Sequence, residues 1–149
     1  MLAIGELSRQ TGVKVPTIRY YEQVGLIDAP ERSDGNQRRY GKAELERLGF
    51  IRHARDLGLS LEAIRELIAL SSDPCRSCDE ADGIARQHLH HVRDKISQFQ
   101  NLERELVRIV DGCAGGKRVD DCYVLRSLGD HSLCKREHRG SERTNSRTL

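Results

Sequence analysis

The first part of the chain, residues 4–70, carries apolar residues at helical spacing in short stretches that are separated by turn residues. Gly12 ends the first of these stretches, and Pro16 stands where the first turn of a helix tolerates proline. Two short helices around a turn with glycine are typical of a helix-turn-helix. This pattern therefore predicts a small helical head.

Residues 30–40 hold turn-forming residues followed by basic and aromatic ones, as a short β-hairpin would. Two more amphipathic stretches follow, at residues 42–57 and from Leu61 to about Ser71. Ser60 is a suitable N-cap for the second stretch. Residues 1–71 are accordingly predicted to form a winged helix-turn-helix domain.

Residues 72–111 are predicted to form a hinge followed by one long helix, from Asp79 to about Asp111. The apolar residues of this helix recur in steps of three and four, at positions 85, 89, 92, 96, 99, 102, 106 and 109. A helix of about 33 residues is roughly 50 Å long at 1.5 Å per residue. Because the chain has no second long helix to cover this apolar seam, we expect a homodimer. The alternative, a helix packed on its own head, would leave most of the seam exposed.

The C-terminal part holds a glycine-bearing loop with two cysteines and a short helix around residues 123–128, all within residues 112–134. Residues 135–149 are polar and basic without periodicity, so we expect a disordered tail. This tail has a net charge of +3, which leaves residues 1–134 with a net charge of −1. Overall charge therefore does not identify a nucleic-acid binder, and only the local placement of basic residues can.

Composition narrows the classes of protein further. With 37% hydrophobic and 32% charged residues, the chain of 149 residues can bury a modest core but not a large interior. It lacks the run of about 18 apolar residues of a membrane span and the basic-then-apolar order of a signal peptide, so we expect a cytoplasmic protein. The odd number of cysteines, five, argues against a disulfide framework and leaves thiolates for metal or redox chemistry.

Specific motifs between about residue 2 and about residue 130 carry a resemblance to a known family. They are Ile4-Gly5-Glu6-Leu7, Thr17-Ile18-Arg19-Tyr20-Tyr21-Glu22, Gly25-Leu26, Arg38-Arg39-Tyr40, Phe50-Ile51-Arg52, and Leu57-Gly58-Leu59-Ser60-Leu61 with Ile64. In these motifs the chain resembles the MerR family of bacterial transcription regulators. The resemblance implies a mainly α fold: a winged helix-turn-helix DNA-binding head, a long dimerisation helix in an antiparallel coiled coil, and a short C-terminal metal-binding loop and helix.

The resemblance also implies a mechanism. Members of the family sit on double-stranded promoter DNA as homodimers, and metal binding makes the dimer bend and untwist an overlong spacer between the promoter elements. RNA polymerase then engages both elements, so it is a partner only through the promoter. In energetic terms, roughly a few kcal/mol of DNA deformation are set against protein contacts, and the metal selects the conformation of the dimer.

The resemblance assigns DNA contacts to the second helix, the wing and the end of the following helix. The residues are Thr17, Arg19, Tyr20, Arg38, Tyr40 and Arg55. Thr17 and Arg19 are expected to meet phosphates and base edges near the start of the recognition helix. Arg38, Tyr40 and Arg55 are expected to hold the DNA backbone. Alternatively, the adjacent tyrosines belong to the core and the arginines are only solvated.

Cys78, Cys113 and Cys122 resemble the ligands of the branch that senses divalent heavy metals, with zinc, cadmium and lead sensors nearest in pattern. Mercury sensors share the three cysteines, so a mercury-responsive regulator is the first alternative. Thiolate is a soft ligand that suits these ions. Cys78 and Cys113 are roughly 50 Å apart within one chain, because the long helix lies between them. In an antiparallel dimer, Cys78 of the partner subunit can instead reach Cys113 and Cys122, which gives two equivalent sites across the interface.

Smaller differences bear on the choice of metal. Copper-type members of the family carry serine at the helix-start position, where this chain has Cys78, which favours divalent ions. Typical zinc members carry a second cysteine after the first loop cysteine, and a loop histidine. Here Ala114 and a loop without histidine argue against a two-zinc site. Cys75 and Cys134 are either additional ligands or bystander thiols.

Other classes of protein are weaker candidates. A thiol redox protein using Cys75 and Cys78 would need a strand and a βαβ setting next to this pair, and no strand is readable there. An iron-sulfur regulator would need four clustered cysteines, whereas the loop contains Cys113 and Cys122 alone. An organic-ligand sensor would carry a larger, aromatic-rich C-terminal domain. We therefore do not expect an enzyme.

Overall fold

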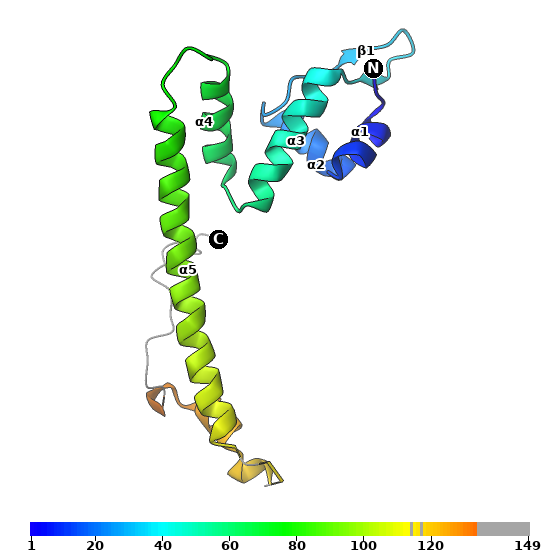
Figure 1. Ribbon diagram of the computed structural model, residues 1–149. Helices are drawn as coiled ribbons and strands as arrows, with labels where there is room; N and C mark the ends of the chain where they lie inside the picture. Colours follow the sequence, from blue (N-terminus) through cyan, green and yellow to red (C-terminus); the bar gives the residue numbers. More distant parts are fainter. Residues whose placement is uncertain (114, 117, 134–149) are drawn as a thin grey trace, which may run out of the picture. The chain divides into compact units, whose positions relative to one another are not determined.

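The computed structural model describes residues 1–113, 115, 116 and 118–133 of the chain. The chain divides into two units, Met1–Ile84 and Ala85–Leu149. The first unit contains the head, whose elements are α1 (Ile4–Thr11), α2 (Val15–Gln23), β1 (Glu31–Arg32), β2 (Arg38–Arg39), α3 (Lys42–Asp56) and α4 (Leu61–Ser71). The long helix α5 (Asp79–Asp111) begins in the first unit and continues through the second (Figure 1). The predicted mainly α fold, with a winged head and a long helix, is confirmed.

One apolar core holds the helices of the head together. Each of the four helices contributes buried side chains from the apolar positions that recur at helical spacing. The fully buried side chains are Leu7, Ile18, Leu26, Tyr40, Leu48, Ile51 and Ile64. Burying a large aliphatic side chain contributes roughly 1.5–3 kcal/mol to the stability of a protein. The core therefore explains why short helices, which would be marginal alone, are stable together.

The turn between α1 and α2 depends on Gly12. Its φ of 69° is left-handed, and its N–H donates to the carbonyl of Ser8 at 2.8 Å, which ends α1. A Cβ at this position would overlap with the guanidinium of Arg52. Pro16 lies in the first turn of α2, where its missing N–H leaves no helical acceptor unpaired. The structure thus contains the helix-turn-helix that the sequence predicts.

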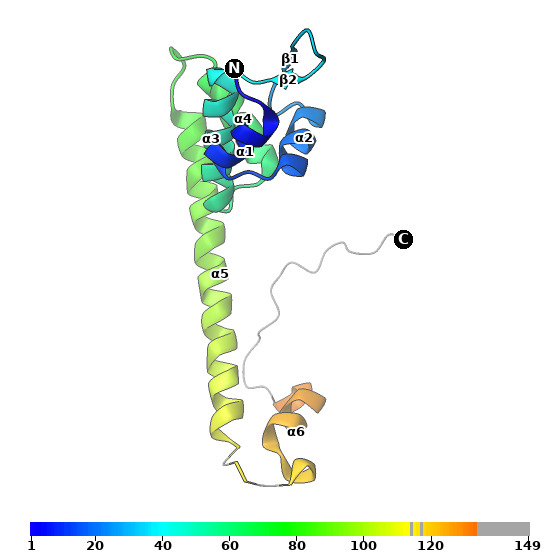
Figure 2. The ribbon, with the colours of Figure 1, turned by 90° about the vertical axis from the view of Figure 1, so that its right-hand side faces the viewer.

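The wing is an antiparallel hairpin in which Arg32 of β1 lies opposite Arg38 of β2 (Figure 2). Asn36 in its turn has a φ of 59° and accepts a hydrogen bond of 2.7 Å from Arg32 Nη1. Backbone hydrogen bonds of 2.7 and 2.9 Å between Leu2 and Tyr40 tie the base of the hairpin to the N-terminal segment. The hairpin is therefore fastened to the helical part of the head.

Local caps set the starts of α3 and α4. The carboxylate of Glu44 accepts a hydrogen bond of 2.7 Å from the N–H of Gly41, just before α3. Ser60 Oγ accepts one of 3.1 Å from the N–H of Ala63, as predicted for an N-cap. These contacts satisfy N–H groups that the first turn of a helix leaves without a helical acceptor.

The long helix α5 is continuous over 33 residues and has the bounds that the sequence predicts. Its apolar seam is largely exposed: Leu89, Val92, Ile96, Phe99 and Leu106 have exposed fractions of 39% to 68%. A row of exposed apolar side chains on one helix is typical of a surface that a partner covers. Within the described residues, no helix combines the length and the apolar character that crossing a bilayer requires.

After α5, the second unit continues with η1 (Val119–Asp121), α6 (Tyr123–Gly129) and η2 (His131–Leu133). Figure 2 shows α6 beside the C-terminal end of α5. Ile109, Glu105 and Ser127 are the buried side chains that the structure describes in this unit. The predicted disordered tail, residues 135–149, lies outside the described residues.

Candidate functional site

The helix α2 has an inner and an outer face. Ile18 and Tyr21 are buried in the head, whereas Arg19 and Tyr20 are exposed and Thr17 is half-buried. The exposed fraction is 48% for Tyr20 and 7% for Tyr21, so the two adjacent tyrosines belong to different environments. One of them is part of the core, and the other is part of the surface. The side chains predicted to contact DNA from this helix are therefore accessible to solvent.

The carboxylate of Glu22, at the end of α2, joins this helix to the wing. The hydroxyl of Tyr40 donates a hydrogen bond to Glu22, and Arg38 Nε lies 3.6 Å from Glu22 Oε2. Burial, together with the neighbouring Glu22 carboxylate, raises the pKa of Tyr40 far above its usual value. The hydroxyl therefore stays protonated and remains a donor to Glu22. The helix α2 and the wing are thus linked by side chains as well as by the core.

The burial of Tyr40 changes the role predicted for it. Its side chain is fully buried, so its ring has no surface that could lie against DNA. Tyr40 instead supports the wing from inside, while Arg38 is exposed. The physical reason is the place of Tyr40 at the base of the hairpin, where its backbone pairs with Leu2 and its side chain joins the core of the head. Sequence reasoning missed Glu22 as the partner of both residues, although it stands in the same motif as Arg19 and Tyr20.

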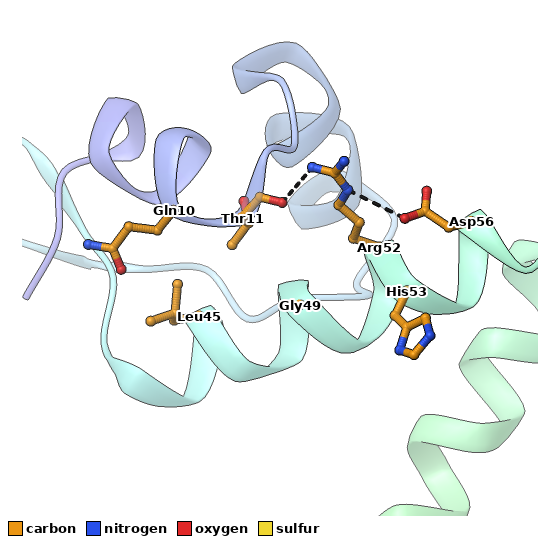
Figure 3. A pocket seen from close by; sticks show the side chains of 7 residues that line it. All are labelled: Gln10, Thr11, Leu45, Gly49, Arg52, His53 and Asp56. Carbon is orange, nitrogen blue, oxygen red and sulfur yellow. Dashed lines mark hydrogen bonds and ion pairs between the residues drawn. The ribbon is translucent and has the colours of Figure 1, made fainter.

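A shallow hollow between the end of α1 and α3 is lined by Gln10, Thr11, Leu45, Gly49, Arg52, His53 and Asp56, and its volume is about 370 Å³ (Figure 3). Arg52 Nη1 donates to the carbonyl of Thr11 at 2.8 Å, and Arg52 Nε lies 3.6 Å from Asp56 Oδ2. A cation at the C-terminal end of a helix stabilises its last carbonyl groups. Arg52 therefore fastens α1 to α3, and we interpret the hollow as a product of this packing.

Arg55, the last of the predicted DNA contacts, lies one residue before the end of α3. It is exposed, and its Nη1 donates a hydrogen bond of 2.9 Å to the carbonyl of Leu59. This bond holds the guanidinium over the turn between α3 and α4. Its contact with the DNA backbone stays a prediction.

The two loop cysteines lie together at the start of α6. The backbone N–H groups of Gly115, Val124 and Tyr123 and the thiol of Cys122 act on the Cys113 sulfur and favour its ionised form. These donors, with Gly115 first, hold the pKa of Cys113 below its usual value, although burial acts in the opposite direction. The first N–H groups of a helix have no partner within it and stabilise negative charge. The loop therefore favours the thiolate of Cys113, which is the form that binds metal ions.

The other predicted ligands lie elsewhere. Cys78 directly precedes α5 and is exposed, as is Cys75 in the preceding turn. Cys134, a predicted additional ligand, lies outside the described residues. Among the residues that the structure describes, no three His, Cys, Asp or Glu side chains come together as a metal site. A single chain thus brings together Cys113 and Cys122 but not Cys78.

Known proteins that are similar to this chain are transcription regulators. Residues 2–70 match the family described as MerR HTH family regulatory protein, and residues 45–109 match the family described as MerR, DNA binding. Over 130 residues, 86% of this chain and 92% of the relative, the chain is 43% identical to the HTH-type transcriptional regulator ZntR of Escherichia coli (strain K12). Over 135 residues, 90% of this chain and 92% of the relative, it is 37% identical to the mercuric resistance operon regulatory protein of Shigella flexneri.

A solved structure gives the same picture. The transcription regulator PbrR691 from Ralstonia metallidurans CH34, in complex with lead(II), matches the chain with a TM-score of 0.75 and 38% sequence identity. The match covers 86% of this chain and 99% of PbrR691. A likeness of this extent reaches beyond the head, residues 1–71.

Proposed function

The chain belongs to the MerR family of HTH regulatory proteins, and on this premise we propose that it is a metal-responsive transcription regulator. It binds promoter DNA as a homodimer and activates heavy-metal resistance or efflux genes when a divalent ion, zinc, cadmium or lead, binds to cysteine thiolates. The observation that carries this proposal is the Cys113–Cys122 pair at the start of α6, where backbone N–H groups lower the pKa of Cys113. The lead(II) complex of the similar regulator PbrR691 supports a soft divalent ion.

The proposed ligands are Cys113 and Cys122 of one protomer and Cys78 of the partner subunit. Helix length supports a shared site, because 33 residues of α helix separate the two ends of α5 by roughly 50 Å. In an antiparallel pair of such helices, the start of one helix lies beside the end of the other. The donor set fits the ion, since three thiolates suit a soft divalent cation. When bound, the ion would join thiolates of two protomers in one coordination sphere.

The proposed DNA contacts are the exposed residues of α2, of the wing and of the end of α3. They are Thr17, Arg19, Tyr20, Arg38 and Arg55, with Tyr40 supporting the wing from the core. Arginine is suited to this role because its guanidinium pairs with phosphate oxygens and with base edges. The proposed control acts through the geometry of the dimer, which distorts the promoter spacer and so reaches RNA polymerase through the DNA.

A titration of the reduced full chain with zinc, cadmium, lead and mercury tests the proposed metal site. Thiolate-to-metal absorption and the stoichiometry are recorded for the wild type and for Cys78→Ser, with Cys75→Ser as the matched control three residues away. We expect one divalent ion per protomer, and an affinity that Cys78→Ser lowers far more than Cys75→Ser. Absence of a thiolate band with every ion would leave a DNA-binding member of the family that responds to another signal.

The same titration ranks the metals. The mercury-responsive alternative is less favoured, because the chain is 43% identical to ZntR of Escherichia coli and 37% identical to the mercuric resistance operon regulatory protein of Shigella flexneri. An affinity that drops equally in both serine variants would make Cys75 an additional ligand. The thiol redox alternative gains no support, because neither described strand lies near Cys75 and Cys78 in the sequence.

A further inference from the structure

The side chain of Tyr123 connects the cysteine loop to the last turns of α5. Tyr123 directly follows Cys122 and is the first residue of α6. Its hydroxyl oxygen accepts a hydrogen bond of 2.6 Å from Arg108 Nη1, and its backbone N–H is among the groups that lower the pKa of Cys113. One residue thus adjoins a loop cysteine in the chain and contacts the long helix through its side chain.

Arg108 is itself held in place by a buried carboxylate. Its Nε donates a hydrogen bond of 3.0 Å to Glu105 Oε2, and the Glu105 side chain is 6% exposed. A buried carboxylate is costly unless a cation accompanies it, so the pair keeps the guanidinium in one orientation. The guanidinium of Arg108 therefore donates to Glu105 from Nε and to Tyr123 from Nη1.

The ring of Tyr123 fits against the end of α5 at a residue that has no side chain. A Cβ on Gly112 would overlap with the ring atoms of Tyr123. The carbon Cζ of Arg108 lies 5.9 Å from the ring centroid, and Cζ of Arg126 lies 5.8 Å from it, which is within the range of cation–π attraction. The ring is therefore fixed by packing and by two cations, in addition to the hydrogen bond of its hydroxyl.

We propose that Arg108 and Tyr123 are positioning residues of the metal site: they fix the Cys113–Cys122 loop on the end of α5 and so determine its affinity for a soft divalent cation. The inference rests on the proposed function, because it concerns the same thiolates. Neither side chain is a ligand. Their contacts set where the thiolates stand relative to α5, and hence relative to the thiolate of the partner subunit.

This placement also couples the site to the dimer. A change in the position of the loop moves Tyr123, and Tyr123 reaches α5 through Arg108 and Gly112. The end of α5 belongs to the same helix as the exposed apolar seam that we propose as the dimer surface. Arg108 and Tyr123 therefore transmit a change in the position of the loop to α5.

Two variants of the full chain test the proposal, with a third as matched control. Tyr123→Phe keeps the ring and the backbone N–H but loses the acceptor for Arg108. Arg108→Lys keeps the charge but cannot reach Glu105 and Tyr123 at once. Arg104→Lys makes the same change one turn earlier on α5, where the exposed Arg104 bonds to Asn101 at 3.0 Å. Lead(II) and cadmium(II) are the probes.

We measure the dissociation constant of each metal, the thiolate-to-metal absorption of the metal-saturated protein, and the thermal unfolding of the metal-free protein. We expect Tyr123→Phe and Arg108→Lys to weaken binding about tenfold, as removal of a group that orients a metal ligand typically does. The band of the saturated variants should also change in position or intensity. Arg104→Lys should match the wild type in each measurement.

The saturated spectrum separates positioning from a general loss of stability. A variant that is only less stable reaches the wild-type spectrum once enough metal is added, whereas a misplaced loop does not. Dissociation constants within twofold of the wild type, together with unchanged saturated spectra, would overturn the inference while leaving the proposed function intact. Absence of a band in the wild-type protein would instead contradict the proposed function.

Discussion

The head and the cysteine loop are held by different kinds of contact. In the head, buried apolar side chains from four helices meet in one core. Around the loop, Ile109 is the buried apolar residue that the structure describes. Polar contacts join Glu105 to Arg108 and Arg108 to Tyr123, whose ring also packs against Gly112. Apolar packing depends on shape and volume, whereas polar contacts depend on the placement of individual atoms. A region held mainly by polar contacts can change its geometry when one donor or charge changes.

The strongest test of this comparison is the removal of a core side chain from the head. Ile51 is fully buried in α3, and we expect Ile51→Ala to lower the free energy of unfolding by about 3 kcal/mol, because it leaves a cavity. Phe50→Ala is the neighbouring control, since Phe50 is 44% exposed. Urea denaturation, monitored by circular dichroism, measures the free energy of unfolding of both variants. Equal losses in the two variants would contradict the assigned core.

The next effect comes from the turn of the helix-turn-helix. We expect Gly12→Ala to cost about 1–2 kcal/mol, because its backbone is left-handed and the new Cβ displaces Arg52 from Thr11. Gly49→Ala should act in the opposite direction by about 0.5–1 kcal/mol, since Gly49 lies within α3 and nothing stands within 4 Å of an added Cβ. Thermal unfolding of both variants shows whether each substitution raises or lowers stability. Two changes in the same direction would contradict this account.

A third variant separates the surface of the head from its core. Arg19 is exposed on α2, so we expect Arg19→Ala to leave the unfolding free energy within about 0.5 kcal/mol of the wild type. Affinity for promoter DNA should fall about tenfold. The slope of log affinity against log salt concentration should become shallower by roughly the amount that one phosphate contact contributes. Fluorescence anisotropy across a salt series measures this, with Arg93→Ala on α5 as control. An unchanged salt slope would count against the DNA contact.

The smallest expected effect compares two tyrosine hydroxyls, one in each region. Tyr40→Phe removes the donor to Glu22, and we expect a loss of about 1 kcal/mol in unfolding free energy with unchanged metal affinity. Tyr123→Phe should show the reverse, a small loss of stability with weaker metal binding. Denaturation measures the unfolding free energy of both variants, and metal titration measures their metal affinity. Parallel behaviour of the two variants would remove the distinction between the regions.

Much of the head could be predicted from sequence because its elements are set by local patterns. Apolar spacing predicts α1 to α4, Gly12 marks the turn, and Ser60 marks the start of α4. The bounds of α5 follow from an uninterrupted apolar series without proline. These signals lie within a few residues of the feature that they predict, so no knowledge of tertiary contacts is needed.

The rest depends on contacts between residues that are distant in sequence. Tyr40 is buried in the core and bonds to Glu22, 18 positions away. Arg108 and Tyr123 are 15 positions apart and stand in no motif. The low pKa of Cys113 depends on N–H groups that point to its sulfur only after the loop has folded. Sequence identifies the cysteines as candidate ligands, but the groups that orient them become visible only in the structure.

The contacts of Glu22 with Tyr40 and Arg38 have a consequence for how promoter DNA would be deformed. Because one carboxylate links α2 to the wing, we expect these two elements to keep a constant separation and to move as one body. In the proposed complex, such a head would span a constant length of the groove. A change in the twist or bend of the promoter would then come from displacement of one whole head relative to the other, and the long helices of the proposed dimer would be the elements that produce it.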